Sequence, residues 1–274
     1  MNRLFVVNKP IFISSNFYLN RIKRKYKTKK AGFSGTLDPF ASGCLIVAFG
    51  QYSKLFRFLK KTPKTYRTTI FLGAKSGSLD IENIEQVDIV SSFDISFIKE
   101  KLQNLVGEQE YLPPKYSAKK IDGKRAYSLA RENIDFELKK IISTIYDVKF
   151  INYSHPFITF DITVSEGSYI RSLAQLFLED IGSYGTLSYL ERLNEGEFYF
   201  DNEKALNPIE YIDLPINKYS GTKEWFELGR KLDIKYFQIQ KDGEYLVVFD
   251  EFFSIIEIKG TTIKYILNKV LKDG

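Results

Sequence analysis

The chain has 274 residues, of which 44% are hydrophobic and 27% charged, the composition of an ordinary soluble globular protein. Its one cysteine excludes an internal disulfide, and its one histidine excludes a His/Cys metal site. The N-terminal apolar stretch LFVV is too short for a signal peptide, and no run is long enough to span a membrane. We therefore expect a cytoplasmic protein without a metal, whose chemistry would rest on carboxylate, phenol, guanidinium or amine groups.

The positive charge is concentrated near the N-terminus. Residues 21–30 (RIKRKYKTKK) contain seven Lys or Arg and no acid, and removing these seven charges from the formal net charge of +6 leaves −1 for the rest. A solvated helix face normally mixes both signs, whereas a run of one sign around an aromatic residue is typical of a phosphate-binding surface. We predict a nucleic acid partner. Anionic membranes and acidic proteins are the alternatives, but no lipid-facing amphipathic helix accompanies the run.

The hydrophobic periodicity predicts a mixture of strands and helices. In chain order we expect a strand at 4–7, a serine-capped basic helix at 15–25, a strand at 45–49, a helix at 53–59, a strand at 66–72, and a helix that Asp94 caps and Gly107 ends. There follow an Asp122-Gly123 hairpin turn, a short helix at 126–131, strands at 141–150 and 157–164, and a helix that Ser168 caps and Gly182 ends. Because strands and helices do not alternate regularly, we predict an α+β fold with a mixed, mainly antiparallel sheet flanked by helices.

A domain boundary is expected near 214–221, where LPINKYSG brings proline, asparagine, serine and glycine together. It divides the chain into a main domain, 1–215, and a small β-rich module, 216–274. A module of this size is marginal for an independent hydrophobic core. We therefore expect it to pack against the main domain.

One acid, Asp38, stands among small residues in KKAGFSGTLDPFASG, residues 29–43. An Asp-Pro step is a common helix start, with the aspartate as N-cap and the proline as the first helical residue. The alternative is a functional carboxylate. Pro39 restricts Asp38 to extended conformations, and Gly35 and Gly43 allow backbone or nucleotide to approach closely. The loop by itself leaves both interpretations open.

The segment GFSGTLDPFASG resembles the signature of the TruB-type tRNA pseudouridine synthases, G-T-L-D-P followed by A-[ST]-G. Four further stretches match that family in its own order: NKPIFISSN, KTYRTTIFLG, YLPPKYSAKKIDGKRAYSLAR and SEGSYIRSLAQ. Together the matches span residues 8–193. The resemblance implies the pseudouridine synthase fold in 1–215 and a short PUA-like RNA-binding module in 216–274. It further implies isomerisation of uridine 55 in the tRNA T loop by a monomer that needs no cofactor.

The resemblance also implies roles for individual residues. Asp38 would be the nucleophile acting on a flipped-out base, Arg171 would keep that carboxylate ionised and aimed, and Tyr66 would stack on the uracil. The substrate pocket would also contain Lys9, Phe33, Gly35, Thr36, Leu37, Tyr169 and Leu190. Phosphates of the T stem-loop would contact Arg21, Lys23, Arg24, Lys27, Lys115, Lys119 and Lys120.

Three residues depart from the family pattern. Phe33 stands where a histidine is usual, Asn8 where an aspartate is usual, and Phe12 where a glycine is frequent. A phenylalanine can stack on a displaced base but cannot form the hydrogen bonds of a histidine. Two rival interpretations stay open: a tRNA-binding or tRNA-folding module without chemistry, and a pseudouridine synthase with another RNA target. The ionisable Asp38, together with Arg171 and Tyr66, favours an enzyme.

Overall fold

The computed structural model describes residues 1–117, 119–121, 123–126, 129, 132, 134 and 136–272. Its main sheet is built from strands at both ends of the main domain. These strands are β1 (Arg3–Lys9), β2 (Ala31–Phe33), β3 (Ser42–Phe49), β4 (Lys64–Leu72), β7 (Gly107–Tyr111), β10 (Ile141–Ser154), β11 (Phe157–Val164), β12 (Gly185–Glu195) and β13 (Phe198–Tyr199). They follow the order β1-β3-β12-β4-β11-β10-β7, with β2 beside β3 and β13 beside β12. Every pair is antiparallel except β12 with β3, in agreement with the predicted mainly antiparallel sheet.

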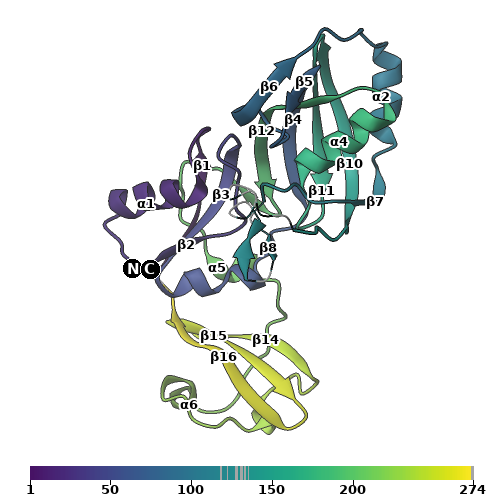
Figure 1. Ribbon diagram of the computed structural model, residues 1–274. Coiled ribbons are helices and arrows are strands. Elements are labelled where there is room, and N and C mark those ends of the chain that lie inside the picture. The colour runs from purple at the N-terminus through teal and green to yellow at the C-terminus, as the bar shows by residue number, and fades with distance from the viewer. Residues whose placement is uncertain are drawn as a thin grey trace.

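Helices α1 (Ser15–Lys25), α2 (Ile95–Gln103) and α4 (Ile170–Asp180) pack against strands of the main sheet, whereas α6 (Lys223–Glu227) lies beside the strands at the C-terminal end of the chain (Figure 1). The structure also has a short helix, α5 (Pro208–Tyr211), and the 3₁₀ turns η1 (Gly50–Lys54), η2 (Phe56–Phe58), η3 (Ile81–Asn83) and η4 (Ile234–Tyr236). Short hairpins add β5 (Ala74–Ser76) with β6 (Ile84–Val87) and β8 (Lys120–Ile121) with β9 (Lys124–Arg125). In the described part of the chain, no helix is long and apolar enough to cross a membrane.

The predicted helix boundaries at 15, 25, Asp94 and Gly182 agree with the structure, and three other helix predictions do not. The Ser14 and Asp94 side chains cap α1 and α2 as expected, but α2 ends at Gln103, so Gly107 opens β7 instead of closing the helix. Ser168 is not the cap of α4, because its hydroxyl donates to the carbonyl of Ser165 and the helix starts one residue later. The helix expected at 53–59 is the pair of 3₁₀ turns η1 and η2. The predicted hairpin turn at Asp122 and most of the helix at 126–131 lie outside the described residues.

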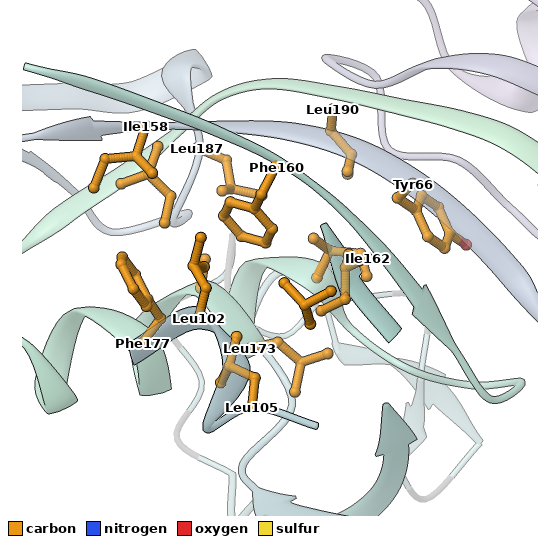
Figure 2. Close-up of a cluster of buried hydrophobic side chains, with 14 of the residues drawn as sticks. Tyr66, Leu102, Leu105, Ile158, Phe160, Ile162, Leu173, Phe177, Leu187 and Leu190 are labelled. Atoms are coloured by element: carbon orange, nitrogen blue, oxygen red, sulfur yellow. The ribbon is translucent and has the colours of Figure 1, made fainter. Parts of the chain in front are cut away.

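The core of the main domain lies between the sheet and the helices α2 and α4. Side chains along β4 alternate strictly between buried and half-buried, so the predicted face of this strand, which carries Tyr66, Ile70 and Leu72, is buried. Figure 2 shows Tyr66 at one end of this apolar cluster, with its hydroxyl pointing away from the other side chains. The cluster therefore holds the ring of Tyr66 in place, and its hydroxyl meets the Arg192 guanidinium on the neighbouring strand.

Helix α1 lies against the other end of the sheet and exposes its basic side. Its Leu19 and Ile22 pack against Phe5, Val7 and the apolar residues of β3. These two residues are three positions apart and so lie on one helix face. The lysines and arginines of 21–30 consequently point mainly to solvent.

The C-terminal strands form a separate antiparallel sheet, drawn in yellow in Figure 1. It consists of β14 (Gly243–Val248), β15 (Phe252–Lys259) and β16 (Thr262–Leu271). Leu246, Phe253 and Val270 from these strands share one apolar cluster with residues of β1, β3, η1 and η2. The Asn2 side chain also donates to the carbonyl of Leu271, so the two ends of the chain lie close together. As expected, these strands pack against the main domain.

We predict that Gly43→Ala lowers the free energy of unfolding by more than about 1 kcal/mol. Gly43 has a φ of 104°, and a Cβ there would overlap the backbone carbonyl oxygen of Arg192, its partner on β12. Gly182→Ala is the matched control, because Gly182 has a φ of 64° but a Cβ there would meet no described atom within 4 Å. Urea-induced unfolding of both variants measures the difference. Equal losses would show that the contact with β12 adds nothing to the backbone strain.

Candidate active site

The loop between β2 and β3, residues 34–41, carries Asp38 and is called the signature loop below. A pocket of about 320 Å³ lies where this loop, β4, β12 and the start of α4 meet. Segments that are far apart in the sequence contribute its walls. The lining residues are Gly35, Thr36, Leu37, Asp38, Lys64, Tyr66, Lys119, Ser165, Glu166, Gly167, Ser168, Tyr169, Ile170, Arg171, Leu190 and Arg192. Most of the residues that the sequence assigned to a substrate pocket are therefore brought together.

Asp38 and Arg171 form an ion pair within this pocket, with 2.8 Å between Asp38 Oδ2 and Arg171 Nη2. Arg171 lies in the first turn of α4, and its side chain is only 4% exposed. Its guanidinium also donates to the carbonyls of Ser78 and Tyr116, each at 2.8 Å, and lies 3.4 Å from the carboxylate of Asp80. One guanidinium thus joins four segments of the chain and fixes the direction of the Asp38 carboxylate.

Burial dominates the electrostatics of Asp38. It raises the pKa of the Asp38 carboxyl above its ordinary value, the Arg171 guanidinium acts against this rise, and the neighbouring Asp80 adds to it. About a third of the side chain (34%) is still accessible from the pocket. The ionised carboxylate is therefore poorly solvated, depends on Arg171, and faces the space that a substrate would occupy.

The loop that carries Asp38 forms no helix. Residues 39–40 form a turn closed by a hydrogen bond from the Ala41 amide to the Asp38 carbonyl, so the interpretation of Asp38 as a helix N-cap is wrong. Buried polar side chains hold the loop from below. Ser15 Oγ binds both the amide and the carbonyl of Leu37, at 3.0 and 2.9 Å. Arg192 donates to the carbonyl of Gly35 at 2.9 Å.

Lys9 supports the same loop and does not line the pocket. It is fully buried, and its ammonium donates to the carbonyls of Pro10, Ile13 and Pro39, at 2.9, 2.7 and 3.2 Å. A lysine has three N–H donors, and all three are used. The expectation that Lys9 contacts the substrate is thus corrected. Burial lowers its pKa to about 8, against the opposing attraction of Asp38.

The aromatic residues of the site occupy different walls. Tyr66 and Leu190 are buried at the pocket floor, and Tyr66 lies directly across from Arg192 in the pairing of β4 with β12. Burial raises the pKa of Tyr169, so its phenol stays protonated near neutral pH. Phe33 lies elsewhere, in a second hollow of about 640 Å³ that shares Asp38 and Arg171 with the first. Phe33 and Tyr66 therefore line different hollows, both of which include the ion pair.

The basic residues expected to contact RNA are mostly exposed. Arg21, Arg24 and Lys27 are exposed, Lys23 is half-buried, and Lys25 is bound to Glu203 at 2.6 Å. The second hollow reaches from Asp38 to the first residues of α1, so the basic helix adjoins the candidate site. On the other side Lys115 is exposed and Lys119 lines the first pocket. The side chain of Lys120 lies outside the described part of the chain.

Sequence reasoning missed several polar residues of the site. Asp80, Ser15, Arg192 and Glu195 are all buried, and each binds the signature loop or the guanidinium of Arg171. The alternation along β4 does carry a usable signal for Lys64, which shares the buried face of Tyr66. Among the residues that the structure describes, no group of three or more His, Cys, Asp or Glu side chains could hold a metal ion.

Comparison with known sequences relates the chain to one family. Residues 23–170 match the TruB family pseudouridylate synthase (N terminal domain). A protein of Sulfurovum sp. (strain NBC37-1) named tRNA pseudouridine synthase B is 55% identical over 272 residues, which cover 99% of this chain and 98% of that protein. A protein of the same name from Campylobacter curvus (strain 525.92) is 53% identical over 272 residues, which cover 99% of this chain and 100% of the relative.

Comparison with solved structures shows the same fold at low sequence identity. A chain of a Cbf5-Nop10-Gar1 complex superposes with a TM-score of 0.67 at 17% identity, over 98% of this chain and 84% of that one. A chain of an H/ACA RNP bound to a substrate RNA containing 2'-deoxyuridine gives a TM-score of 0.67 at 16% identity, over 99% and 85% of the two chains. The predicted α+β fold with additional C-terminal strands is thereby confirmed.

The buried ammonium of Lys9 predicts a specific pH dependence of stability. Its pKa is about 8 in the native protein and 10.5 as its ordinary value, so the unfolded chain binds this proton more tightly. Lys9 therefore contributes stability above pH 10.5 that is lost as the pH falls through 8. We expect the unfolding free energy of the parent, relative to that of Lys9→Met, to increase by roughly 3 kcal/mol as the pH rises from 8 to 10.5. Urea unfolding at a series of pH values measures it, and a constant difference would contradict the lowered pKa.

Proposed function

Because the chain belongs to the TruB family of pseudouridylate synthases, we propose that it converts uridine 55 in the T loop of tRNA to pseudouridine. Its relatives are named tRNA pseudouridine synthase B, and the chain matches them over nearly their whole length. The observation that carries the proposal is the Asp38–Arg171 ion pair in a pocket floored by Tyr66. A module that only binds or folds tRNA has no need of a poorly solvated carboxylate aimed into a nucleoside-sized pocket.

In the proposed reaction, Asp38 acts as a nucleophile toward the sugar or the base of the bound uridine. The bond between ribose C1′ and uracil N1 breaks, the base turns, and a bond forms between C1′ and C5. C5 loses its proton, N1 gains one, and the carboxylate leaves again, so the reaction is an isomerisation. Arg171 supports this role because it keeps the carboxylate ionised in surroundings that favour the neutral acid.

Tyr66 and Tyr169 would bound the base in the pocket. Tyr66 is held by the core and lines the pocket, and its hydroxyl, which points away from the apolar cluster, hydrogen-bonds the Arg192 guanidinium of the same pocket wall. A uridine in the T loop must leave its stack to enter, at a cost of a few kcal/mol. Contacts of the exposed lysines and arginines with RNA phosphates would offset that cost.

The binding surface would extend from the pocket in two directions. One runs through the second hollow to α1, and the other passes Lys119 to the exposed Lys115. We assign residues 216–274 as a PUA-like RNA-binding module attached to the catalytic domain 1–215. We further propose that the protein acts in the cytoplasm as a monomer.

Replacing Asp38 with Asn should abolish pseudouridine formation at position 55 and leave tRNA affinity within a few-fold of the parent. The amide has nearly the same shape as the carboxylate but cannot act as the nucleophile. The melting temperature of the variant should change little, because the guanidinium of Arg171 keeps Asp80 and the carbonyls of Ser78 and Tyr116 as partners. Mass spectrometry of a tRNA transcript incubated with each protein measures the product. Turnover by the variant would disprove the assignment of the nucleophile.

The basic segment 21–30 should control tRNA binding and not the chemical step. Replacing Lys23, Arg24 and Lys27 with Gln should weaken binding and make its salt dependence shallower, by about 0.7 to 0.9 log units per log unit of salt for each lost phosphate contact. Single-turnover conversion at saturating RNA should be nearly unchanged, since none of the three lines the pocket.

Two neighbouring residues give a matched control for that experiment. Arg24 is exposed and pairs with no acid in the described part of the chain, whereas Lys25 is bound to Glu203 at 2.6 Å. Arg24→Gln and Lys25→Gln remove the same charge from the same helix. Only Arg24→Gln should flatten the salt dependence appreciably. Equal effects would mean that net charge alone, and not direct contact, governs binding.

A further inference from the structure

Lys64 is a buried cation at the pocket floor that the proposed chemistry does not use. Its side chain is 7% exposed and lines the pocket. On β4 it lies two residues before Tyr66, on the same face of the sheet. At 3.2–3.4 Å per strand residue, the two positions are roughly 6.5 Å apart. Lys64 is thus the neighbour of Tyr66 on the same face of β4, and Tyr66 carries the ring proposed to contact the uracil.

Two carboxylates share the ammonium of Lys64. Glu195, which is fully buried, lies across from it on β12, with 3.2 Å between Lys64 Nζ and Glu195 Oε1. Glu166 lies 4.0 Å away, and it is bound more tightly to Lys61, at 2.8 Å. Glu195 is also held by Ser34 and Arg192, so it belongs to the frame of the site. Glu166 is different, because about half of its side chain (52%) is exposed.

Cations outnumber anions among the side chains that line the pocket, which are Lys64, Lys119, Arg171 and Arg192 against Asp38 and Glu166. Behind this lining the buried Glu195 pairs with Lys64 and Arg192, and Asp80 pairs with Arg171. Although burial acts against it, the ammonium groups of Lys61 and Lys64 lower the pKa of Glu166, so this carboxylate is ionised at neutral pH. The exposed Glu166 is therefore an anion beside the cationic groups of the pocket wall. A second anion that enters the pocket must compete with it for the two lysines.

We propose that Lys64 and Lys61 form a phosphate subsite for the nucleotide that enters the pocket, and that Glu166 occupies this subsite when RNA is absent. The proposal rests on the proposed function, since it takes the nucleotide to be the uridine that is isomerised. A base and its phosphate are joined only through the ribose. A base that stacks on Tyr66 therefore places a phosphate within reach of the ammonium of Lys64, two residues away on β4.

The subsite explains why an acid stands at the entrance of a site for a polyanion. Without RNA, two lysines this close together would repel each other in poorly solvated surroundings, and Glu166 relieves that repulsion. When a phosphate arrives, it takes over the charge pairing, and Glu166 is free to turn to solvent. Glu166 would thus lower the affinity for RNA, and it would stabilise the positions of the two lysines when RNA is absent.

The test combines protein variants with RNAs that lack one phosphate charge. T stem-loop RNAs are made with an uncharged methylphosphonate on the 5′ side of the target uridine, on its 3′ side, or far from it in the stem. The measured quantity is the enzyme concentration that gives half-maximal single-turnover conversion. With natural RNA, Glu166→Gln should lower this concentration severalfold and Lys61→Gln should raise it severalfold. With one of the two flanking methylphosphonates, both effects should disappear, while the distant one should leave them intact.

Lys64 itself needs a paired replacement, because removing it alone would leave the buried Glu195 uncompensated. The double variant Lys64→Gln/Glu195→Gln removes both charges at once, and the amide oxygen that replaces the carboxylate at position 195 can still accept from Ser34 and Arg192. A melting temperature close to that of the parent is required before its activity is compared. The double variant should raise the half-maximal concentration roughly tenfold with natural RNA and have little effect with the same flanking methylphosphonate. Lys60→Gln is the matched control, because Lys60 pairs with Glu197 at 3.8 Å and does not line the pocket.

Equal effects of Glu166→Gln on the natural RNA and on both flanking methylphosphonate RNAs would overturn the subsite, and so would no effect on any of them. The same assay separates this failure from failure of the proposed function. If the parent protein forms pseudouridine at position 55 without the phosphate dependence, only the subsite is wrong. If the parent forms none there, the proposed function is wrong.

Discussion

The buried guanidinium of Arg171 is the interaction on which the site depends. It binds the carboxylate of Asp38, lies against Asp80, and donates hydrogen bonds to the carbonyls of Ser78 and Tyr116. Removing one partner of a buried ion pair typically costs about 3–5 kcal/mol, because the other charge is left without compensation. The same group thus joins four segments of the fold and favours the ionised form of the Asp38 carboxylate. Folding and the ionisation of Asp38 cannot be changed independently at this position.

The signature loop has no regular structure, so its shape depends on what lies beneath it. Lys9, Ser15 and Arg192 each bind a backbone group of residues 35–39, and Glu195 binds the hydroxyl of Ser34. Buried polar groups are costly unless they are fully paired, which makes such a network rigid once it is formed. The small residues of the loop fit this arrangement, because a Cβ at Gly35 would crowd both Arg192 and Glu195. The loop is held by the fold, and it positions Asp38 in turn.

Local patterns were enough to predict β1, β3, β4, β10 and β11, but not β12, the strand that lies between β3 and β4. The motif residues of the pocket were expected from the resemblance to a known family. The alternation in β4 and the apolar stripe of α4 reflect the short periods of strands and helices, which are visible in a window of ten residues. The assignment of Lys9 to the substrate failed for a different reason. Lys9 can be buried because the carbonyls of residues 10, 13 and 39 all accept hydrogen bonds from its ammonium. Only the tertiary structure brings these three carbonyls together. Asp80 was missed for the same reason, since its partner lies 91 residues away.

The replacement of the usual histidine by Phe33 simplifies the electrostatics of the site. Phe33 flanks Asp38 from the second hollow, where a ring can exclude water and stack on a base but cannot titrate. The one histidine of the chain, His155, is bound to Tyr153 in the turn between β10 and β11 and takes no part in either hollow. Among the groups described around Asp38, burial raises the pKa of the carboxyl group itself and lowers that of Lys9 to about 8. Since Arg171 already holds the carboxylate in place, the site needs no imidazole to aim it.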